Sequence, residues 1–330
     1  MAEQLAPPSD PVPDDGYRWW YFDATSDDGR HAMTAIVFIG SVFSPWYAFA
    51  RRRGPTPAIE HCAVNLALYG PEARWCMTER GRTAVRAGAT SLAIGPSRLD
   101  TGDGGWRLDI EERSAPFGRR LRGTIEIDTD RTPVVPELAL DAGGLHRWQP
   151  IRPQTRLKVT MLDPALSWEG PAYVDTNRGS VPLERSFDTW HWSRAHADDG
   201  STLIRYDVIE RDRNVPPASR TLAIAADGTL AEGAAGERRE LGRTRWFRVP
   251  RPTRLREGAS VARLRTFEDA PFYSRSHFLE RIGESTHSVV HESLDMGRFT
   301  NPLVQGLLPF RTPRRFGSGL PGRATPATDG

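Results

Sequence analysis

Apolar and polar residues alternate along several short segments of the chain, which is the pattern of strands with one buried face. Residues 61–68 and 121–127 alternate cleanly, and residues 156–161 and 202–209 follow the same period of two. The Asp-Gly pair at 227–228 is typical of a hairpin turn. Sustained helical periodicity is scarce, so the pattern predicts an all-β protein with at most short helices.

Two segments that lie 171 residues apart resemble each other. The motif WWYF at Trp19 precedes DDG and a strand, and the motif WHWS at Trp190 precedes a second DDG and another strand. This repetition predicts two related β-domains in tandem. Each is about the size of a lipocalin-like β-barrel, whose lumen can hold one small ligand.

The repeat suggests where the two domains begin and end. We place the N-terminal lipocalin-like domain at residues 16–170 and the C-terminal one at residues 171–315, with the boundary in a turn-rich stretch. The flanking segments, 1–15 and 316–330, are rich in Pro, Gly and polar residues and are expected to be disordered.

Composition narrows the function classes. The 330-residue chain has a net charge of +2 with acidic and basic residues interspersed, so we expect no nucleic-acid partner. A mean hydropathy of -0.51 and the lack of a long apolar run predict a soluble protein. The acidic, Pro-rich start differs from a secretory signal, which favours a cytoplasmic location.

Motifs of cofactor and metal chemistry are missing. Ser41 and Ser193 have no nucleophile-elbow context, and no Gly-rich phosphate loop follows a strand. The three histidines His61, His191 and His291 match no common metal-ligand spacing. We therefore expect neither a metal nor a cofactor.

Ten segments of the chain are similar, in order, to those of the acyclic carotenoid 1,2-hydratases, also called hydroxyneurosporene synthases. They are GYRWWYFDATSDDG, IVFIGSVFSPWYAFARRRG, HCAVNLALYG, RWCMTER, LHRWQPI, YVDTNRGSVPLE, FDTWHWSRA, FEDAPFYSRS, HESLDMGRF and LPFRTPRR. The resemblance runs from about Gly16 to Arg315. The aromatic opening alone is less specific, because related two-barrel proteins such as tocopherol cyclase share it. Ala172, where a glycine is more usual, and the tripeptide starting at Asp295 depart from the family pattern.

The resemblance implies an activity. In this family, water adds without a cofactor to the terminal 1,2 double bond of an acyclic carotenoid such as neurosporene or lycopene. The product is a 1-hydroxy carotenoid in the photosynthetic carotenoid pathway of purple bacteria. Protonating such an alkene needs a carboxylic acid that burial keeps protonated, and the tertiary cation formed needs aromatic shelter.

The resembling segments hold candidates for this chemistry. His146 and Trp148 are two residues apart, as are Tyr173 and Asp175, so each pair can point from one strand into one lumen. We assign Asp175 as proton donor and Trp148 as the face that stabilises the cation. Tyr173 and His146 would hold Asp175 or the water. The alternatives are an Asx-turn at Asp175, in its turn-rich surroundings, and a structural role for His146.

Four further residues are candidates for substrate binding: Trp190, His191, Trp192 and His61. Core packing is the alternative for the tryptophans.

Two other functions fit the same fold. One is an enzyme that cyclises or isomerises a polyene or isoprenoid, and the other is a lipocalin-like lipid carrier without catalysis. Carotenoids partition into lipid, so a hydratase would collect its substrate at the inner or photosynthetic membrane as a peripheral protein. The aromatic residues of segment 41–53 and the arginines that end it are candidates for this contact.

Overall fold

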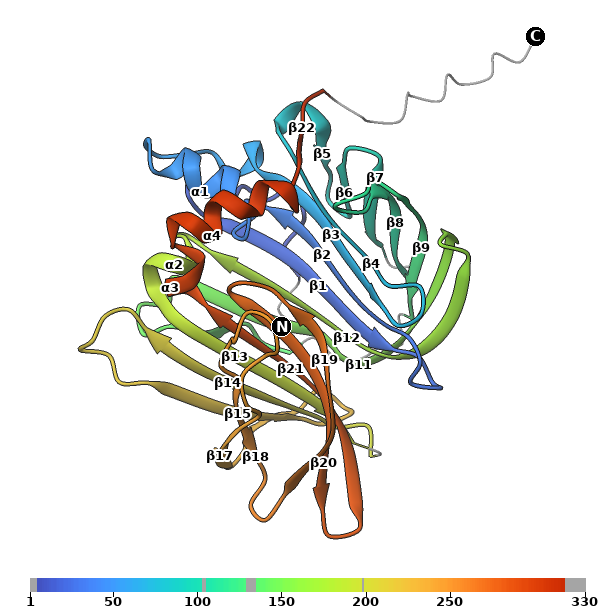
Figure 1. Cartoon of the computed structure of the whole chain (residues 1–330), viewed down its shortest axis with the longest axis vertical. Helices are drawn as coiled ribbons and strands as arrows, with labels where there is room; N and C mark the ends of the chain where they lie inside the picture. The colour runs from blue at the N-terminus through green and yellow to red at the C-terminus, as the bar shows by residue number, and fades with distance from the viewer. Residues whose placement is uncertain (1–4, 103–104, 129–134, 198, 318–330) are drawn as a thin grey trace.

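The computed structural model describes residues 5–102, 105–128, 135–197 and 199–317. Most of these residues lie in strands, with a few short helices (Figure 1), which confirms the predicted all-β fold. Between the strands of these described ranges, every pairing is antiparallel except the one between β22 and β4.

The strands form two large sheets and one hairpin. In hydrogen-bonded order, the first sheet holds β22 (Arg314–Arg315), β4 (Arg74–Arg80), β3 (Cys62–Tyr69), β2 (Ala32–Ile39), β1 (Tyr17–Thr25), β12 (Leu166–Gly179), β11 (His146–Asp163), β9 (Arg120–Ile127), β8 (Gly105–Arg113), β7 (Ser97–Gly102), β6 (Ser91–Ile94) and β5 (Val85–Ala87), while β10 (Leu138–Ala139) pairs with β11. The second sheet holds β16 (Leu230–Glu232), β15 (Ala218–Ile224), β14 (Thr202–Glu210), β13 (Phe187–His196), β21 (Ser285–Asp295), β20 (Tyr273–Ile282) and β19 (Ser260–Asp269). The separate hairpin consists of β17 (Glu237–Glu240) and β18 (Pro252–Leu255).

The helices are short. The α-helices are α1 (Pro45–Arg51), α2 (Leu183–Ser186), α3 (Met296–Phe299) and α4 (Pro302–Leu307), and the 3-10 helices are η1 (Ala58–Glu60), η2 (Arg82–Ala84) and η3 (Leu308–Phe310). Both α1 and α4 begin with a proline after a capping side chain, Ser44 and Asn301 respectively, which accepts a backbone N–H of the first turn. In the described part of the chain, no helix is long and apolar enough to cross a bilayer.

The predicted repeat is visible in the strand register. Tyr21 on β1 pairs with Asp175 on β12, and Trp192, which lies 171 residues after Tyr21, pairs with Glu292 on β21. Tyr21 also pairs with Ile36 on the next strand, as Trp192 does with Tyr206. The segments that begin near Trp19 and Trp190 therefore occupy equivalent places, as the repeat predicted.

The repeat units do not end where the sequence suggested. β12 is bonded along its length to β1, so residues 171–179 belong to the first sheet. The predicted boundary at residue 170 thus falls inside a strand, and the chain passes to the second sheet only after Gly179. At the N-terminus, Leu5 and Val12 pack against the first core, while residues 1–4 and 318–330 of the predicted disordered ends lie outside the described residues.

The two sheets pack face to face (Figure 1). One hydrophobic core lies inside the curled first sheet, and another is built from both sheets where they meet. Successive residues of a strand point to opposite faces. On β1, Trp20 and Phe22 therefore join a core inside the curled first sheet, whereas Trp19 and Tyr21 face the second sheet. The hydrogen-bonded order ends at β22 and β5 in the first sheet and at β16 and β19 in the second, so neither sheet closes into a barrel by strand pairing among the described residues.

Equivalent side chains of the two repeats contact each other across this interface. The ring centroids of Trp19 and Trp190 lie 6.4 Å apart, and Nε of Arg194 donates a 2.8 Å hydrogen bond to Oδ1 of Asp23. Both pairs are separated by 171 residues in sequence. Strands β1 and β13 therefore face each other in nearly two-fold fashion, and the space beside them is the region described next.

Candidate active site

A pocket with about 1070 Å³ of atom-free space, including its open mouth, lies between the two sheets. One wall of this pocket, called its floor here, consists of residues from neighbouring strands of the first sheet. Asp175, Tyr21, Ile36, Asn65 and Met77 are successive cross-strand partners on five neighbouring strands, and all five line the pocket. At about 4.8 Å between strands, this row spans about 19 Å. The floor is thus long, and it carries Asp175 at one end.

The second sheet builds the opposite wall in the same way. Tyr206, Trp192, Glu292, Arg275 and Glu268 are successive cross-strand partners, and all except Arg275 line the pocket. The pocket therefore lies between two sheets and not in a barrel lumen, where the sequence analysis expected it. The reason is that these side chains sit on the faces that the sheets turn toward each other.

Asp175 is buried, and neutral groups surround its carboxyl group. Oδ2 accepts hydrogen bonds from Nε1 of Trp148 at 2.9 Å and from the hydroxyl of Tyr173 at 2.8 Å. Oδ1 accepts one from Nδ2 of Asn177 at 3.1 Å. Because Asp175 belongs to strand β12, the Asx-turn alternative does not describe its setting.

These surroundings favour the protonated acid. Burial raises the pKa of Asp175 from 3.8 to about 7, since a charge in this setting loses its hydration. The hydrogen bonds from Trp148 and Tyr173 oppose this rise, and the negative charges of Glu292 and Asp23 add to it. At neutral pH much more of Asp175 is therefore protonated than of an ordinary, solvated aspartate.

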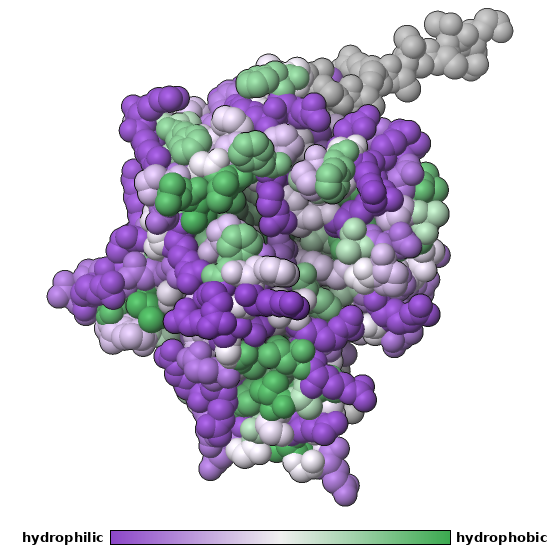
Figure 2. All heavy atoms as spheres, in the orientation of Figure 1, coloured by the Kyte–Doolittle hydropathy of each residue, from purple (hydrophilic) through white to green (hydrophobic). Residues whose placement is uncertain are grey.

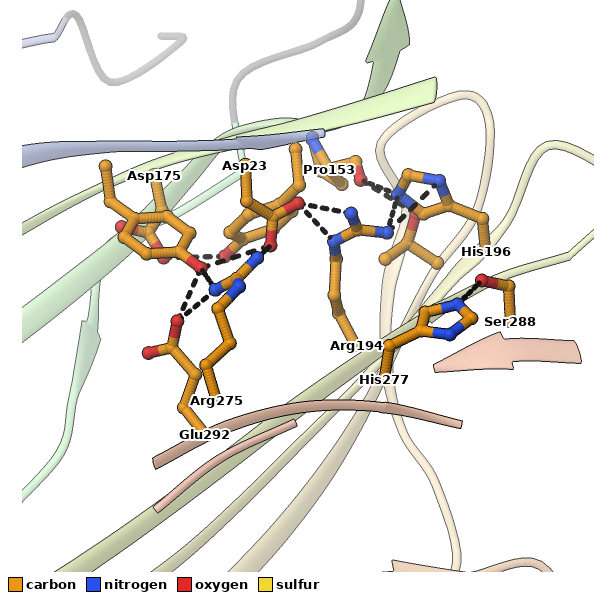
Figure 3. A network of polar contacts seen from close by, with 12 residues as sticks. Asp23, Pro153, Asp175, Arg194, His196, Arg275, His277, Ser288 and Glu292 are labelled. Carbon is orange, nitrogen blue, oxygen red and sulfur yellow. Dashed lines mark hydrogen bonds and ion pairs between the residues drawn. The ribbon is translucent and has the colours of Figure 1, made fainter. Parts of the chain in front are cut away.

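A buried network of charges joins the two sheets beside the pocket (Figure 3). Asp23 on β1 forms ion pairs with Arg194 on β13 and Arg275 on β20, and Arg275 forms another with Glu292 on β21. Tyr21 donates a 2.8 Å hydrogen bond from its hydroxyl to Oε1 of Glu292. Burial would raise the pKa of Asp23, but the two arginines outweigh burial and lower it. Among the described residues, cations contact Asp23 but not Asp175, so the pKa values of the two groups shift in opposite directions.

The structure brings three of the four predicted catalytic residues together. Trp148 and Tyr173 both hold Asp175, but Trp148 is fully buried behind the carboxyl group and does not line the pocket. His146 does not contact Asp175. Its Nδ1 lies 2.9 Å from the hydroxyl of Tyr17, and its Nε2 lies 2.8 Å from Oγ of Ser186. Burial lowers the pKa of His146 to about 4, which makes it a neutral ring in the wall behind the site.

A glycine makes room for this histidine. A Cβ at Gly179 would lie 2.8 Å from Nδ1 of His146 and 2.4 Å from Cε1 of Tyr17, which is closer than packing allows. The last residue of β12 therefore has to be a glycine for the Tyr17–His146 pair to pack across it.

The predicted substrate-binding residues separate into two groups. Trp190 and Trp192 line the pocket. His191 points to the other face of β13, where Nδ1 lies 3.0 Å from Oγ of Ser293, and His61 contacts Glu79 and Arg314 away from the pocket. No group of three potential metal ligands is found among the described residues.

Sequence reasoning missed four residues of the site: Tyr21, Asn177, Tyr206 and Glu292. Asn177 could have been found, because it lies two residues after Asp175 and so shares its strand face. Tyr206 and Glu292 carry no local signal, since only the packing of the second sheet on the first brings them to the pocket.

Comparisons with known proteins identify the family to which the chain belongs. Residues 35–320 match the model of the carotenoid hydratase family CrtC. An acyclic carotenoid 1,2-hydratase of Thiocapsa roseopersicina is 44% identical over 300 residues, which cover 91% of this chain and 73% of that protein. A protein of the same name from Cereibacter sphaeroides is 36% identical over 284 residues, which cover 86% of this chain and 98% of that protein.

A solved structure supports the fold. A Nitrosomonas europaea protein assigned as AttH superposes with a TM-score of 0.59 at 15% identity, covering 88% of this chain and 99% of that one. At this identity the likeness concerns the fold alone. The family model and the two hydratases carry the assignment: the chain belongs to the CrtC family of carotenoid hydratases.

Proposed function

We propose that this chain adds water across the terminal 1,2 double bond of acyclic carotenoids, such as neurosporene, lycopene and their derivatives, to give 1-hydroxy carotenoids. The observation that carries the proposal is the state of Asp175. It is a buried carboxyl group with a pKa raised to about 7, and it lines a pocket with aromatic walls. The names of the relatives at 36–44% identity support the same reaction.

Asp175 is the proton donor of this mechanism. Its acid proton passes to carbon 2, the π electrons form the new C–H bond, and a tertiary cation remains at carbon 1. Water then forms the C–O bond at carbon 1 and gives up a proton. At pH 7 only about one in 10³ ordinary Asp side chains is protonated, so the raised pKa supplies several hundred times more acid.

Trp148 and Tyr173 position the donor. Both hydrogen bonds end on Oδ2 and fix the orientation of the carboxyl group. Of the residues that the structure describes, only Asn177 contacts Oδ1, at 3.1 Å. His146 acts one layer further out, through Tyr17, whose ring stacks on Trp19 with centroids 4.8 Å apart. It supports the wall and does not touch the reacting atoms.

The aromatic side chains of the second sheet shelter the cation. Trp190, Trp192 and Tyr206 line the pocket, and the ring centroids of Trp190 and Tyr206 lie 5.6 Å apart. Each aromatic face can stabilise a nearby cation by about 0.5–2 kcal/mol. In this arrangement the pocket-lining rings take the role that the sequence analysis gave to Trp148.

The structure also supports a peripheral contact with a membrane, at a surface that includes only part of the segment first considered. In segment 41–53, Tyr47 and Arg51 are buried, whereas Arg52 and Arg53 are exposed. Helices α4 and η3 instead expose Leu303, Leu307 and Phe310, of which 80%, 57% and 77% are accessible. Figure 2 shows hydrophobic side chains gathered over the region of α4, with hydrophilic ones around them.

This surface lies at the pocket. Leu308, the first residue of η3, and Arg311, which follows η3, line the pocket. The exposed Arg52 at the end of α1 bonds to Gln305 of α4, which places positive charge beside the apolar side chains. An anionic bilayer fits both features, with the leucines and Phe310 among the lipids and the arginine at the headgroups. A docked carotenoid would then enter from the membrane into the pocket.

Product mass tests the function. Purified protein is incubated with lycopene and with neurosporene in lipid dispersions, and the products are weighed by mass spectrometry. Hydration adds the mass of one water, cyclisation or isomerisation leaves the mass unchanged, and a carrier returns the substrate unaltered. The Asp175→Asn protein should lose about 10²–10⁴ in turnover and still bind the carotenoid.

Asp207→Asn is the matched control for this variant. Asp207 lies on β14 beside Tyr206, but it is bonded to Nε of Arg254 at 2.6 Å and does not line the pocket. Its replacement should leave turnover near the wild-type rate. An Asp175→Asn protein that hydrates lycopene as fast as this control would refute the assignment of the donor.

A further inference from the structure

Two carboxyl groups occupy equivalent positions of the two repeats. Asp175 is the cross-strand neighbour of Tyr21, and Glu292 is the cross-strand neighbour of Trp192, the residue that corresponds to Tyr21. Both line the pocket, one on each wall. The repeat therefore places a second carboxyl group opposite the side of the pocket that holds the proton donor.

The two carboxyl groups differ in their partners. Among the described residues, Asp175 accepts hydrogen bonds only from neutral groups. Glu292 instead forms an ion pair with the cation Arg275. Two carboxyl groups in one site, one held by neutral donors and the other paired with a cation, are the arrangement that general acid and base catalysis needs.

One oxygen of Glu292 is free. Oε1 binds both Tyr21 and Arg275, whereas Oε2 accepts no hydrogen bond from any residue that the structure describes. In Figure 3 both dashed contacts of Glu292 end on the same oxygen. The side chain is 12% exposed and lines the pocket.

A donor without an acceptor lies on the neighbouring strand. The indole N–H of Trp192 is buried and finds no hydrogen-bond acceptor within the described ranges, and Trp192 also lines the pocket. A buried water molecule needs two to four polar partners. Trp192 and Glu292 are cross-strand partners, so the N–H of the one and the free Oε2 of the other lie on the same wall of the pocket.

We propose that Glu292 is the base that holds the attacking water and accepts its proton, with Trp192 as the second contact of that water. This role rests on the proposed hydratase function and extends it. The water oxygen bonds to carbon 1 of the cation while one water proton passes to Oε2 of Glu292. Asp175 is left as a carboxylate and Glu292 as an acid. A proton moves from Glu292 to Asp175 through solvent before the next turnover, so the net change is addition of one water.

Deuterium labelling separates the two carboxyl groups. In D₂O, Asp175 delivers a deuteron to carbon 2. If water does not capture the cation, loss of a proton regenerates an alkene, and the recovered substrate carries deuterium. The ratio of deuterium exchange to hydration, measured by mass spectrometry on lycopene, should therefore rise by about 10² in Glu292→Gln. Asp175→Asn should instead lower exchange and hydration together.

Two further variants control for folding and for burial of charge. Trp192→Phe keeps an aromatic ring but removes the N–H, and its ratio should rise in the same direction by a smaller factor. Glu268→Gln changes another pocket carboxyl group, which binds Tyr69 at 3.2 Å. It should leave the ratio unchanged, whatever its effect on rate.

The outcomes are distinct. An unchanged ratio in Glu292→Gln, with hydration either at the wild-type rate or reduced in step with exchange, would overturn the role of Glu292. Wild-type protein that forms no hydrated product at all would instead overturn the proposed function. Thermal unfolding of each variant shows whether a loss of both reactions comes from loss of the fold.

Discussion

Replacement of Tyr173 by phenylalanine should extend the hydration activity to higher pH. The Tyr173 hydroxyl donates a 2.8 Å hydrogen bond to Oδ2 of Asp175. Burial raises the pKa of Asp175 to about 7, and this hydrogen bond opposes burial because it stabilises the carboxylate. Only the protonated form donates a proton. Activity is therefore present below this pKa and lost as pH rises through it. In Tyr173→Phe the loss of activity should occur at a higher pH.

The size of the shift follows from the hydrogen bond. A hydrogen bond to a charged group contributes about 1.5–3 kcal/mol, and one pKa unit corresponds to about 1.36 kcal/mol. This gives about one to two units. Trp148 keeps its 2.9 Å hydrogen bond to the same oxygen, so the lower end applies. The alkaline limb of the pH–rate profile should move from about 7 to about 8.

Initial rates of lycopene hydration across pH measure this shift. Tyr206→Phe is the matched control, because Tyr206 is a buried tyrosine of the same pocket whose hydroxyl makes no hydrogen bond to Asp175. Its alkaline limb should stay at the wild-type position. A Tyr173→Phe limb that stays at the wild-type pH, or moves to lower pH, would show that this hydroxyl does not tune the acid.

The remaining predictions concern stability and docking. Because the pKa of Asp175 rises from 3.8 to about 7 on folding, the folded state holds a proton that the unfolded chain has lost, and wild-type stability should fall as pH rises from about 4 to about 7. Asp175→Asn removes this loss, so urea unfolding should find it more stable above pH 7 by up to about 4 kcal/mol, with the difference vanishing toward pH 4. A difference that does not depend on pH would contradict the raised pKa. The double variant Leu307→Ser, Phe310→Ser should reduce co-sedimentation with anionic vesicles by about tenfold or more, since each buried side chain contributes about 1.5–3 kcal/mol. Leu162→Ser, which alters a 61% exposed side chain near the β11–β12 turn, should bind vesicles as the wild type does; equal binding of all three proteins would place the contact elsewhere.

Local patterns were sufficient to predict individual strands. The alternation in residues 61–68 corresponds to β3 and that in residues 121–127 to β9. In β9 one face is buried and the other exposed, whereas β3 is buried on both faces and its alternation separates the apolar core face from the face with smaller and polar residues. The Asp-Gly pair at 227–228 lies in the turn between β15 and β16, where Gly228 has a φ of 83°. Strand alternation and tight turns depend only on residues that are close in sequence, so the sequence alone was sufficient to predict them.

Pairings between distant segments were not predictable in the same way. The return of β12 to β1 joins residues such as Asp175 and Tyr21, and no local signal marks which sheet a strand will enter. The contact of Tyr21 with Glu292 spans 271 residues. The family resemblance was enough to predict Asp175 and its neighbours on β11 and β12 as site residues. The residues of the second sheet that face them could be identified only from the way the two sheets pack.

The contact between Asp23 and Arg194 has a consequence for how such a molecule arises. In a symmetric dimer each residue on the axis meets its own copy, so an aspartate at this position would bury two like charges against each other. Two copies joined in one chain are free of that constraint, and one position can hold an acid while its counterpart holds a base. For the same reason, Asp175 and Glu292 can occupy equivalent positions of the two repeats and still have different hydrogen-bond and ion-pair partners. Duplication followed by divergence within one polypeptide is therefore a route to a site whose two halves differ in charge, which identical subunits could not form.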